Sequence, residues 1–121
     1  MNYKSLKLDI SEKVALVTLS QPKKFNSMTL IFWQEILDVF NKIENSDARV
    51  AIINAEGKHF SSGIDLNEFA SLGIIKEKDV GRNAENIRKI IKKLQESFNV
   101  IENSRVPVLA AIHGACIGGA V

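Results

Sequence analysis

Hydrophobic and polar residues follow two different periods along the chain, and the change of period marks its elements. Leu6–Ile10 alternates apolar and polar side chains, and a short polar turn separates it from Val14–Leu19, a denser apolar and β-branched run. A period of two is typical of a strand with one buried face. The two segments therefore predict an antiparallel hairpin whose second strand is the more buried.

After a loop at Gln21–Ser27, apolar residues recur three and four positions apart. This spacing predicts a helix that begins at a cap on Ser27 or Thr29 and ends near Asn45. Arg49–Ala55 then returns to a strand pattern, so the unit reads strand, helix, strand. Such a unit favours parallel pairing with a right-handed crossover. The expected apolar face of the helix consists of Phe32, Trp33, Ile36, Leu37, Phe40 and Ile43.

The second half of the chain repeats this alternation, which makes the fold class α/β. Leu66–Leu72 is expected as a short helix, and the mixed segment Ile74–Gly81 as the most mobile part. Ala84–Asn103 predicts the longest helix, and Val106–Ile112 the last strand, which is apolar on both faces and needs covering elements. The apolar stripe of the long helix consists of Ile87, Ile90, Ile91, Leu94, Phe98 and Ile101.

Two turns of small residues follow apolar strands and carry the candidate chemistry. Ser61-Ser62-Gly63 precedes the short helix, and His113–Gly119 follows the last strand. Small residues let a bound group approach backbone N–H groups closely. Two such turns can direct two N–H donors at one oxygen, which is the construction of an oxyanion hole.

Composition excludes several classes of protein. A net charge of +2, without an aromatic and basic array, does not favour nucleic acid as a partner. The longest apolar run is too short to span a membrane. One cysteine excludes an internal disulfide framework. Met1–Ile10 lacks the apolar core of a signal peptide, so a cytoplasmic location is expected if the source is bacterial.

Three segments carry a resemblance to a known family. Leu19–Met28 (LSQPKKFNSM), His59–Leu66 (HFSSGIDL) and Pro107–Val121 (PVLAAIHGACIGGAV) resemble successive signatures of the enoyl-CoA hydratase/isomerase (crotonase) family. Together with Gln95–Glu102 (QESFNVIE), they look most like its dienoyl-CoA isomerase branch. The resemblance implies a crotonase-like spiral of β-β-α units. Residues 1–121 would be the N-terminal part of a single acyl-CoA-binding domain, truncated after the second glycine turn.

The resemblance also implies roles for residues. Backbone N–H groups of Ser62 and Gly119 would form the oxyanion hole that holds the thioester oxygen of an unsaturated fatty acyl-CoA. Coenzyme A is part of this substrate, and no other cofactor or metal is implied. A side chain at Gly63 is expected to weaken acyl-CoA binding and to leave thermal unfolding almost unchanged. The expected substrate-binding residues are Ser61, Ser62, Gly63, Ile64, Asp65 and Gly119.

The family's proton-transferring carboxylates would lie beyond Val121, so the chain alone does not separate isomerase from hydratase chemistry. We expect the intact protein, a homotrimer or hexamer, to isomerise dienoyl-CoA, and this chain to be inactive. Enoyl-CoA hydratase and a non-catalytic truncated family member are the alternatives. Asp65 is expected to cap the helix that follows it. Gly118–Val121 should open a helix but stop before one turn forms.

Other reactive side chains have simpler interpretations. His59 beside the first turn is expected to be polar surface rather than a base, and His113 a packing or capping residue rather than a metal ligand. Cys116 is expected to fill a small space in the core. The basic residues in Arg88–Lys93 fit a solvated helix face better than a phosphate site. The spacing in Gly114–Gly119 matches neither of the common glycine-rich phosphate motifs.

Overall fold

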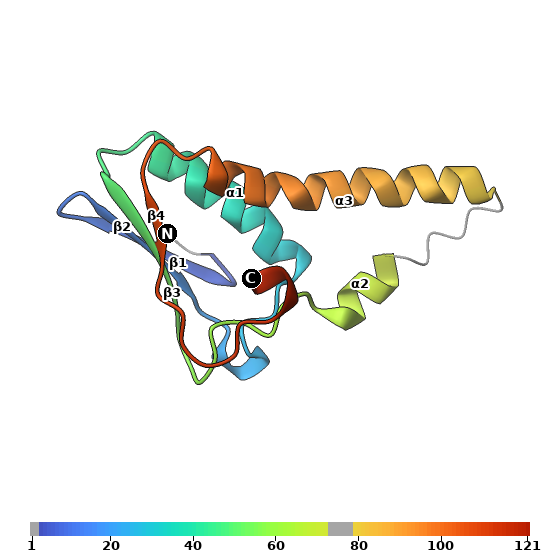
Figure 1. Ribbon diagram of the computed structural model, residues 1–121, viewed down its shortest axis with the longest axis horizontal. Coiled ribbons are helices and arrows are strands. Elements are labelled where there is room, and N and C mark those ends of the chain that lie inside the picture. The colour runs from blue at the N-terminus through green and yellow to red at the C-terminus, as the bar shows by residue number, and fades with distance from the viewer. Residues whose placement is uncertain (1–2, 73–78) are drawn as a thin grey trace.

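A four-stranded sheet with two long helices on one face forms the body of the computed structural model, which describes residues 3–72 and 79–121 (Figure 1). The strands lie in the order in which they occur in the chain. Short 3₁₀ turns, η1 and η2, lie in two of the loops. The elements are β1 (Leu6–Ser11), β2 (Val14–Leu19), η1 (Pro22–Lys24), α1 (Leu30–Glu44), β3 (Val50–Ala55), α2 (Leu66–Leu72), α3 (Val80–Glu102), β4 (Val108–Ala110) and η2 (Gly118–Ala120).

The predicted hairpin is confirmed. Strands β1 and β2 pair antiparallel, with Leu6 opposite Leu19 and Leu8 opposite Val17. Glu12 and Lys13 have φ values of 50° and 68° in the connecting turn. Positive φ at both central residues gives the backbone twist that a two-residue hairpin turn needs.

Parallel pairing of β2 with β3 is also confirmed, with Val17 opposite Ile53. The last strand is shorter than Val106–Ile112 predicts: β4 pairs with β3 over three residues. Its two faces are apolar, as expected, and Leu109 and Ile112 are more than half exposed. The strand is short because, beyond Ala111, the backbone turns away from β3 to hydrogen-bond with the loop at Phe60.

Helix α1 covers the inner face of the sheet. Of the two candidate caps, Thr29 is the N-cap: its hydroxyl accepts a hydrogen bond from the Phe32 N–H at 3.2 Å. The apolar face packs against buried residues of β1, β2 and β3 such as Leu6, Val17 and Ala51. The residues that α1 buries are Phe32, Trp33, Ile36, Val39, Phe40 and Ile43.

Helix α3 differs from its prediction in two ways. It begins at Val80, four residues earlier than expected, because the Asp79 side chain accepts the Gly81 N–H at 2.9 Å. Most of the expected mobile segment falls on residues 73–78, outside the described residues.

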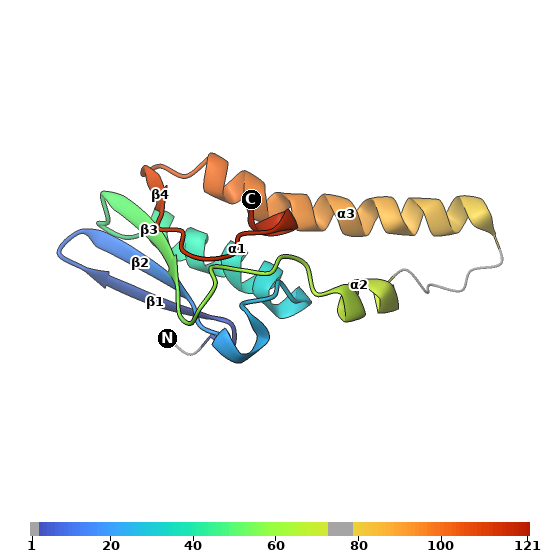
Figure 2. The same ribbon diagram turned by 60° about the horizontal axis from the view of Figure 1, so that its bottom comes forward.

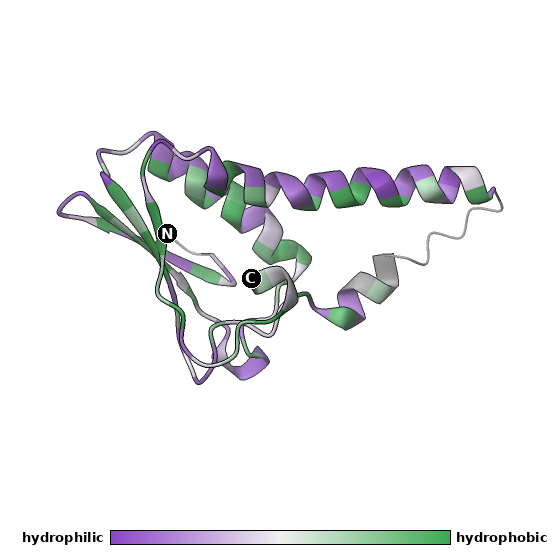
Figure 3. Ribbon diagram, in the orientation of Figure 1, coloured by the Kyte–Doolittle hydropathy of each residue, from purple (hydrophilic) through white to green (hydrophobic). Residues whose placement is uncertain are grey.

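The apolar stripe of α3 is only partly buried. Ile87, Ile91 and Phe98 are 41%, 40% and 44% exposed, whereas Ser97 is buried and donates to the Trp33 carbonyl oxygen at 3.1 Å. Much of α3 projects past the sheet and α1, with its apolar positions uncovered (Figure 3). Within the described residues, no helix is long and apolar enough to cross a membrane.

Candidate active site

Three loops meet at one edge of the sheet, at the carboxyl ends of the parallel strands β2, β3 and β4 (Figure 2). We call residues 20–29, after β2, the first loop; residues 56–65, after β3, the second; and residues 111–119, after β4, the third. In α/β sheets ligands bind at this edge, because the loops there converge.

Backbone hydrogen bonds join the second loop to the third. The N–H groups of Phe60 and Ser61 donate to the carbonyl oxygens of His113 and Ala115, at 2.8 and 3.1 Å. The Ile117 N–H donates back to the Ser61 carbonyl at 3.2 Å. This short parallel pairing brings the two small-residue turns together, as the sequence predicted.

A second set of backbone hydrogen bonds joins the first loop to the second. The Ser62 N–H donates to the Phe25 carbonyl oxygen at 2.9 Å. The Met28 N–H donates to the Gly63 carbonyl at 2.7 Å, and the Met28 carbonyl accepts from the Asp65 N–H at 3.0 Å. Since its N–H already has a backbone partner, Ser62 is the wrong choice of oxyanion donor.

Ile64 offers the N–H that Ser62 does not. The peptide group between Gly63 and Ile64 is trans, so its C=O and N–H point in opposite directions. Because the C=O is bound to Met28, the Ile64 N–H points away from the first loop. Among the residues that the structure describes, neither the Ile64 nor the Gly119 N–H has a hydrogen-bond partner.

Close packing places Gly119 beside Ile64. A Cβ built on Gly119 would lie 3.2 Å from Cγ1 of Ile64, and one built on Gly63 would lie 3.6 Å from the Gly119 nitrogen. The turn around Gly119 is formed: the Ala120 and Val121 N–H groups donate to Ile117 and Gly118 as η2. The expectation that no helical turn closes before Val121 is therefore wrong, since a 3₁₀ turn needs fewer residues than an α-helical one.

Gly63 is required by the protein itself. Its φ is +89°, and a Cβ at this position would lie 2.5 Å from the carbonyl oxygen of Ile117. The obstacle to a side chain is thus the third loop, not a ligand. The expectation that a larger residue here spares thermal stability is contradicted by this contact.

Ser61 is another correction. Its side chain is fully buried; the hydroxyl donates to the Asn26 carbonyl at 2.7 Å and accepts from the Gly63 N–H at 3.1 Å. With its backbone N–H and carbonyl also paired, Ser61 has no exposed polar atom for substrate. Ser61 joins the first, second and third loops, and its expected role as a substrate-binding residue is wrong.

The carboxylates beside the second loop bind helix ends. Asp65 Oδ1 accepts the Glu68 N–H at 3.0 Å, which confirms the predicted cap on α2. Glu68 Oε2 accepts the Leu30 N–H at 2.9 Å, at the first turn of α1. Each of these carboxylates therefore accepts a backbone N–H at the first turn of a helix and has a structural role there.

The histidines join loops rather than act on a ligand. His59 Nδ1 accepts the Ala115 N–H at 3.0 Å, and His113 Nε2 lies 2.7 Å from the Gly57 carbonyl. The Cys116 thiol contacts the Ala120 carbonyl. Within the described residues, no group of three His, Cys, Asp or Glu side chains is arranged to bind a metal.

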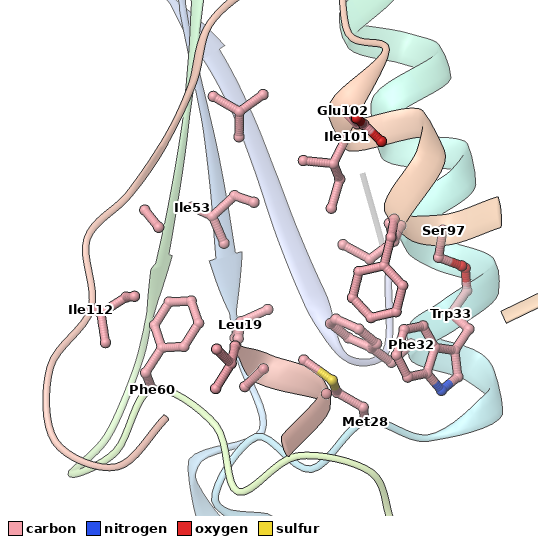
Figure 4. A pocket seen from close by; sticks show the side chains of 17 residues that line it. Leu19, Met28, Phe32, Trp33, Ile53, Phe60, Ser97, Ile101, Glu102 and Ile112 are labelled. Atoms are coloured by element: carbon pink, nitrogen blue, oxygen red, sulfur yellow. The ribbon is translucent and has the colours of Figure 1, made fainter. Parts of the chain in front are cut away.

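An apolar pocket of about 410 Å³ opens between the sheet and the helices α1 and α3 (Figure 4). Met28, Phe32 and Phe60 lie on its walls, and Gly119 borders it. Gly119, one of the two residues with an unpartnered N–H, thus lies where a polar oxygen would be flanked by apolar surface. Low polarity around a hydrogen-bond donor strengthens its interaction with developing negative charge.

Sequence reasoning missed Phe25 and Asn26. Both have φ near +52°, which only a tightly constrained loop imposes on residues other than glycine. The asparagine was a usable signal, since Asn adopts this conformation more readily than most residues and often hydrogen-bonds locally.

Comparison with known proteins identifies the family of the chain. The family described as enoyl-CoA hydratase/isomerase matches residues 9–121. The chain is 45% identical to the mitochondrial Delta(3,5)-Delta(2,4)-dienoyl-CoA isomerase of Homo sapiens and 38% identical to the peroxisomal enzyme of that name from Arabidopsis thaliana. Each alignment covers 99% of this chain, but only 38% and 45% of those relatives.

A solved structure, that of a putative enoyl CoA hydratase/isomerase (crotonase) from Legionella pneumophila, superposes with a TM-score of 0.82 at 28% identity, over 96% of this chain and 42% of that one. The isomerases that match are mitochondrial or peroxisomal, which contradicts the expected bacterial cytoplasmic location. The chain has the crotonase fold and belongs to the enoyl-CoA hydratase/isomerase family.

Proposed function

We propose that the full-length protein, meaning a protein that carries this chain at the length of its relatives, isomerises unsaturated fatty acyl-CoA thioesters of the 3,5-dienoyl type. The observation that carries the proposal is the pair of unpartnered N–H groups on Ile64 and Gly119, on adjacent loops beside an apolar pocket. The 45% identity to a dienoyl-CoA isomerase supports the choice of reaction.

The chemistry follows from where charge develops. Removing a proton from C2 of a 3,5-dienoyl-CoA, the carbon next to the thioester carbonyl, moves electron density onto the carbonyl oxygen, which becomes an enolate oxygen. A proton added at C6 then gives the conjugated 2,4-diene and restores the thioester carbonyl. Two N–H groups fixed before the reaction stabilise that oxygen without reorganising. One such donor is worth about 3 kcal/mol of transition-state stabilisation in well-studied enzymes. The proposed oxyanion hole therefore consists of the Ile64 and Gly119 N–H groups, with Ile64 in the role expected of Ser62.

The second loop also supplies the proposed contacts with the coenzyme A portion of the substrate. We propose that Ile64, Asp65 and the exposed side chain of Ser62 lie against the coenzyme A portion, whereas Gly63, which is buried, allows the close approach of the second and third loops. Coenzyme A enters as part of the substrate, and the proposal requires no metal or separate cofactor. We also propose that the full-length protein assembles as a homotrimer or a hexamer.

Proton transfer requires carboxylates other than those that flank the second loop. Asp65 and Glu68 each accept a backbone hydrogen bond at a helix end. General acid–base catalysis contributes about 10²- to 10⁴-fold to rate, so this chain alone should not turn over. Hydration of 2-enoyl-CoA uses the same oxyanion hole with differently placed carboxylates; the hydratase/isomerase name of the Legionella pneumophila relative favours it as the second candidate.

Kinetics on two substrates separate these reactions. The full-length protein is given a 3,5-dienoyl-CoA, and formation of the conjugated 2,4-diene is followed by its ultraviolet absorbance. It is separately given a 2-enoyl-CoA, and loss of the enoyl absorbance is followed. We expect a higher kcat/KM for the dienoyl substrate; a preference for hydration would replace isomerisation with the second candidate, and no turnover of either would refute both.

A further inference from the structure

Asn26 does not reach the proposed donors, yet its side chain joins the segments that position them. It is only 3% exposed. Its Oδ1 accepts the Gln21 N–H at 2.8 Å, and its Nδ2 donates to the carbonyl oxygens of Glu56 and His59 at 2.9 and 3.2 Å. Both amide hydrogens and the amide oxygen are therefore used. The side chain therefore fixes the first loop to the first residues of the second loop, at Glu56 and His59.

The backbone of Asn26 continues this connection toward Ile64. Its carbonyl oxygen accepts the Ser61 hydroxyl at 2.7 Å, and the same hydroxyl accepts the Gly63 N–H at 3.1 Å. The hydrogen bonds thus run from Asn26 through Ser61 to Gly63, whose carbonyl belongs to the peptide group that carries the Ile64 N–H. All three residues are buried. Buried networks in which every member is satisfied restrict motion strongly.

We propose that Asn26 is a positioning residue of the oxyanion hole, which acts through Ser61 and Gly63 on the direction of the Ile64 N–H. This inference rests on the proposed function. Ile64 lies on the second loop and Gly119 on the third, so the two donors converge only while the Gly63–Ile64 peptide keeps its direction, which its hydrogen bonds to the first loop and to Ser61 fix. Hydrogen bonds weaken steeply as their angle falls, so a small rotation of the Gly63–Ile64 peptide reduces stabilisation of the enolate. Ground-state binding of coenzyme A does not depend on that angle to the same extent.

Two variants of the full-length protein test the role of the amide. Asn26→Gly suits the φ of +52° and removes all three side-chain hydrogen bonds without adding charge. Asn26→Asp keeps the acceptor for Gln21 but removes both donors and adds a negative charge. Asn41→Asp is the matched control for the added charge. Asn41 is exposed on α1, and its Oδ1 accepts a hydrogen bond from Asn45 that an aspartate oxygen can also accept.

The readout is the ionisation of a bound 3-oxoacyl-CoA, whose enolate absorbs in the near ultraviolet. A working hole lowers the pH at which the bound ligand becomes the enolate. We expect Asn26→Gly and Asn26→Asp to raise this apparent pKa by about one unit, which is about a tenfold loss in the equilibrium constant for forming the bound enolate. Because one complete donor is worth about 10²- to 10³-fold in kcat, we expect partial misalignment to lower kcat about tenfold, with KM within about threefold. Asn41→Asp should match the unmodified protein.

Each outcome decides a different claim. Loss of stability alone would reduce the amount of folded protein but not shift the ionisation of the ligand bound to it, so unchanged ionisation in Asn26→Gly overturns the proposal. A shift in Asn26→Asp without one in Asn26→Gly would mean that charge, not position, is responsible, and also overturns it. If one variant fails to fold, the other decides. If the unmodified protein does not shift the ligand's pKa, the proposed function fails instead.

Discussion

Gly63→Ala is expected to destabilise the fold substantially. The added Cβ would lie 2.5 Å from the Ile117 carbonyl oxygen, at a position whose φ is +89°. A left-handed backbone costs a residue with a Cβ about 1–2 kcal/mol. Relieving the overlap with a backbone atom, which cannot rotate away as a side chain can, adds about 1–3 kcal/mol. The free energy of unfolding should therefore fall by about 2–5 kcal/mol in total.

Gly118→Ala is the matched control because it separates these two contributions. Gly118 also has a positive φ, +58°, but a Cβ there would meet no atom within 4 Å. It should show the conformational cost alone, about 1–2 kcal/mol. Urea denaturation of the full-length variants, followed by far-ultraviolet circular dichroism, compares the two. If Gly63→Ala is no more destabilising than Gly118→Ala, the close contact between the second and third loops is wrong.

Four further outcomes are expected. Thr29→Ala should lower the free energy of unfolding by about 0.5–2 kcal/mol in the same assay, whereas Thr29→Ser should keep most of it, since either hydroxyl caps α1. Arg105→Met should lower the free energy of unfolding by about 1–3 kcal/mol, because the guanidinium donates to the carbonyl oxygens of Ile43, in the last turn of α1, and of Ser46 and Ala48, which follow the helix; Arg105→Lys, if equal to the unmodified protein, would contradict this. Hydrogen bonds from Lys42 and Tyr3 hold the pKa of Asp38 below its usual 3.8, so this contribution is present above pH 3.8 and is lost as the pH falls through the lower folded-state pKa; Asp38→Asn should flatten that part of the stability–pH curve in acid titrations. The 121-residue chain alone should not convert a 3,5-dienoyl-CoA, and diene absorbance rising at the rate of the full-length protein would place the proton-transferring group within it.

Local sequence patterns predicted the elements well where burial is one-sided. The alternation in the hairpin and the spacing on α1 each reflect one face packed against the body, and both agree with the structure. The stripe on α3 has the same pattern, but Ile87, Ile91 and Phe98 on it are exposed. Periodicity reports which face is apolar; it carries no information about what covers that face.

The sequence predicted which two loops form the candidate site, but not which backbone N–H groups in them are free to bind a ligand. Glycine and serine runs located the two turns, yet the choice between the Ser62 and Ile64 N–H depends on which one the first loop binds. That contact joins residues more than thirty positions apart, Phe25 and Ser62, through backbone atoms that every residue has. Side-chain identity therefore could not indicate it.

Amide resonances of the second and third loops distinguish the Ile64 N–H from the Ser62 N–H as an oxyanion donor. The full-length protein, labelled with ¹⁵N at glycine, serine and isoleucine, is titrated with a 3-oxoacyl-CoA at a pH where the bound ligand is the enolate. We expect the Ile64 and Gly119 amide protons to move strongly downfield, as N–H groups do when they donate to an anionic oxygen, and the Ser62 amide to stay near its original position because it remains bound to Phe25. A large shift at Ser62 with none at Ile64 would contradict the account.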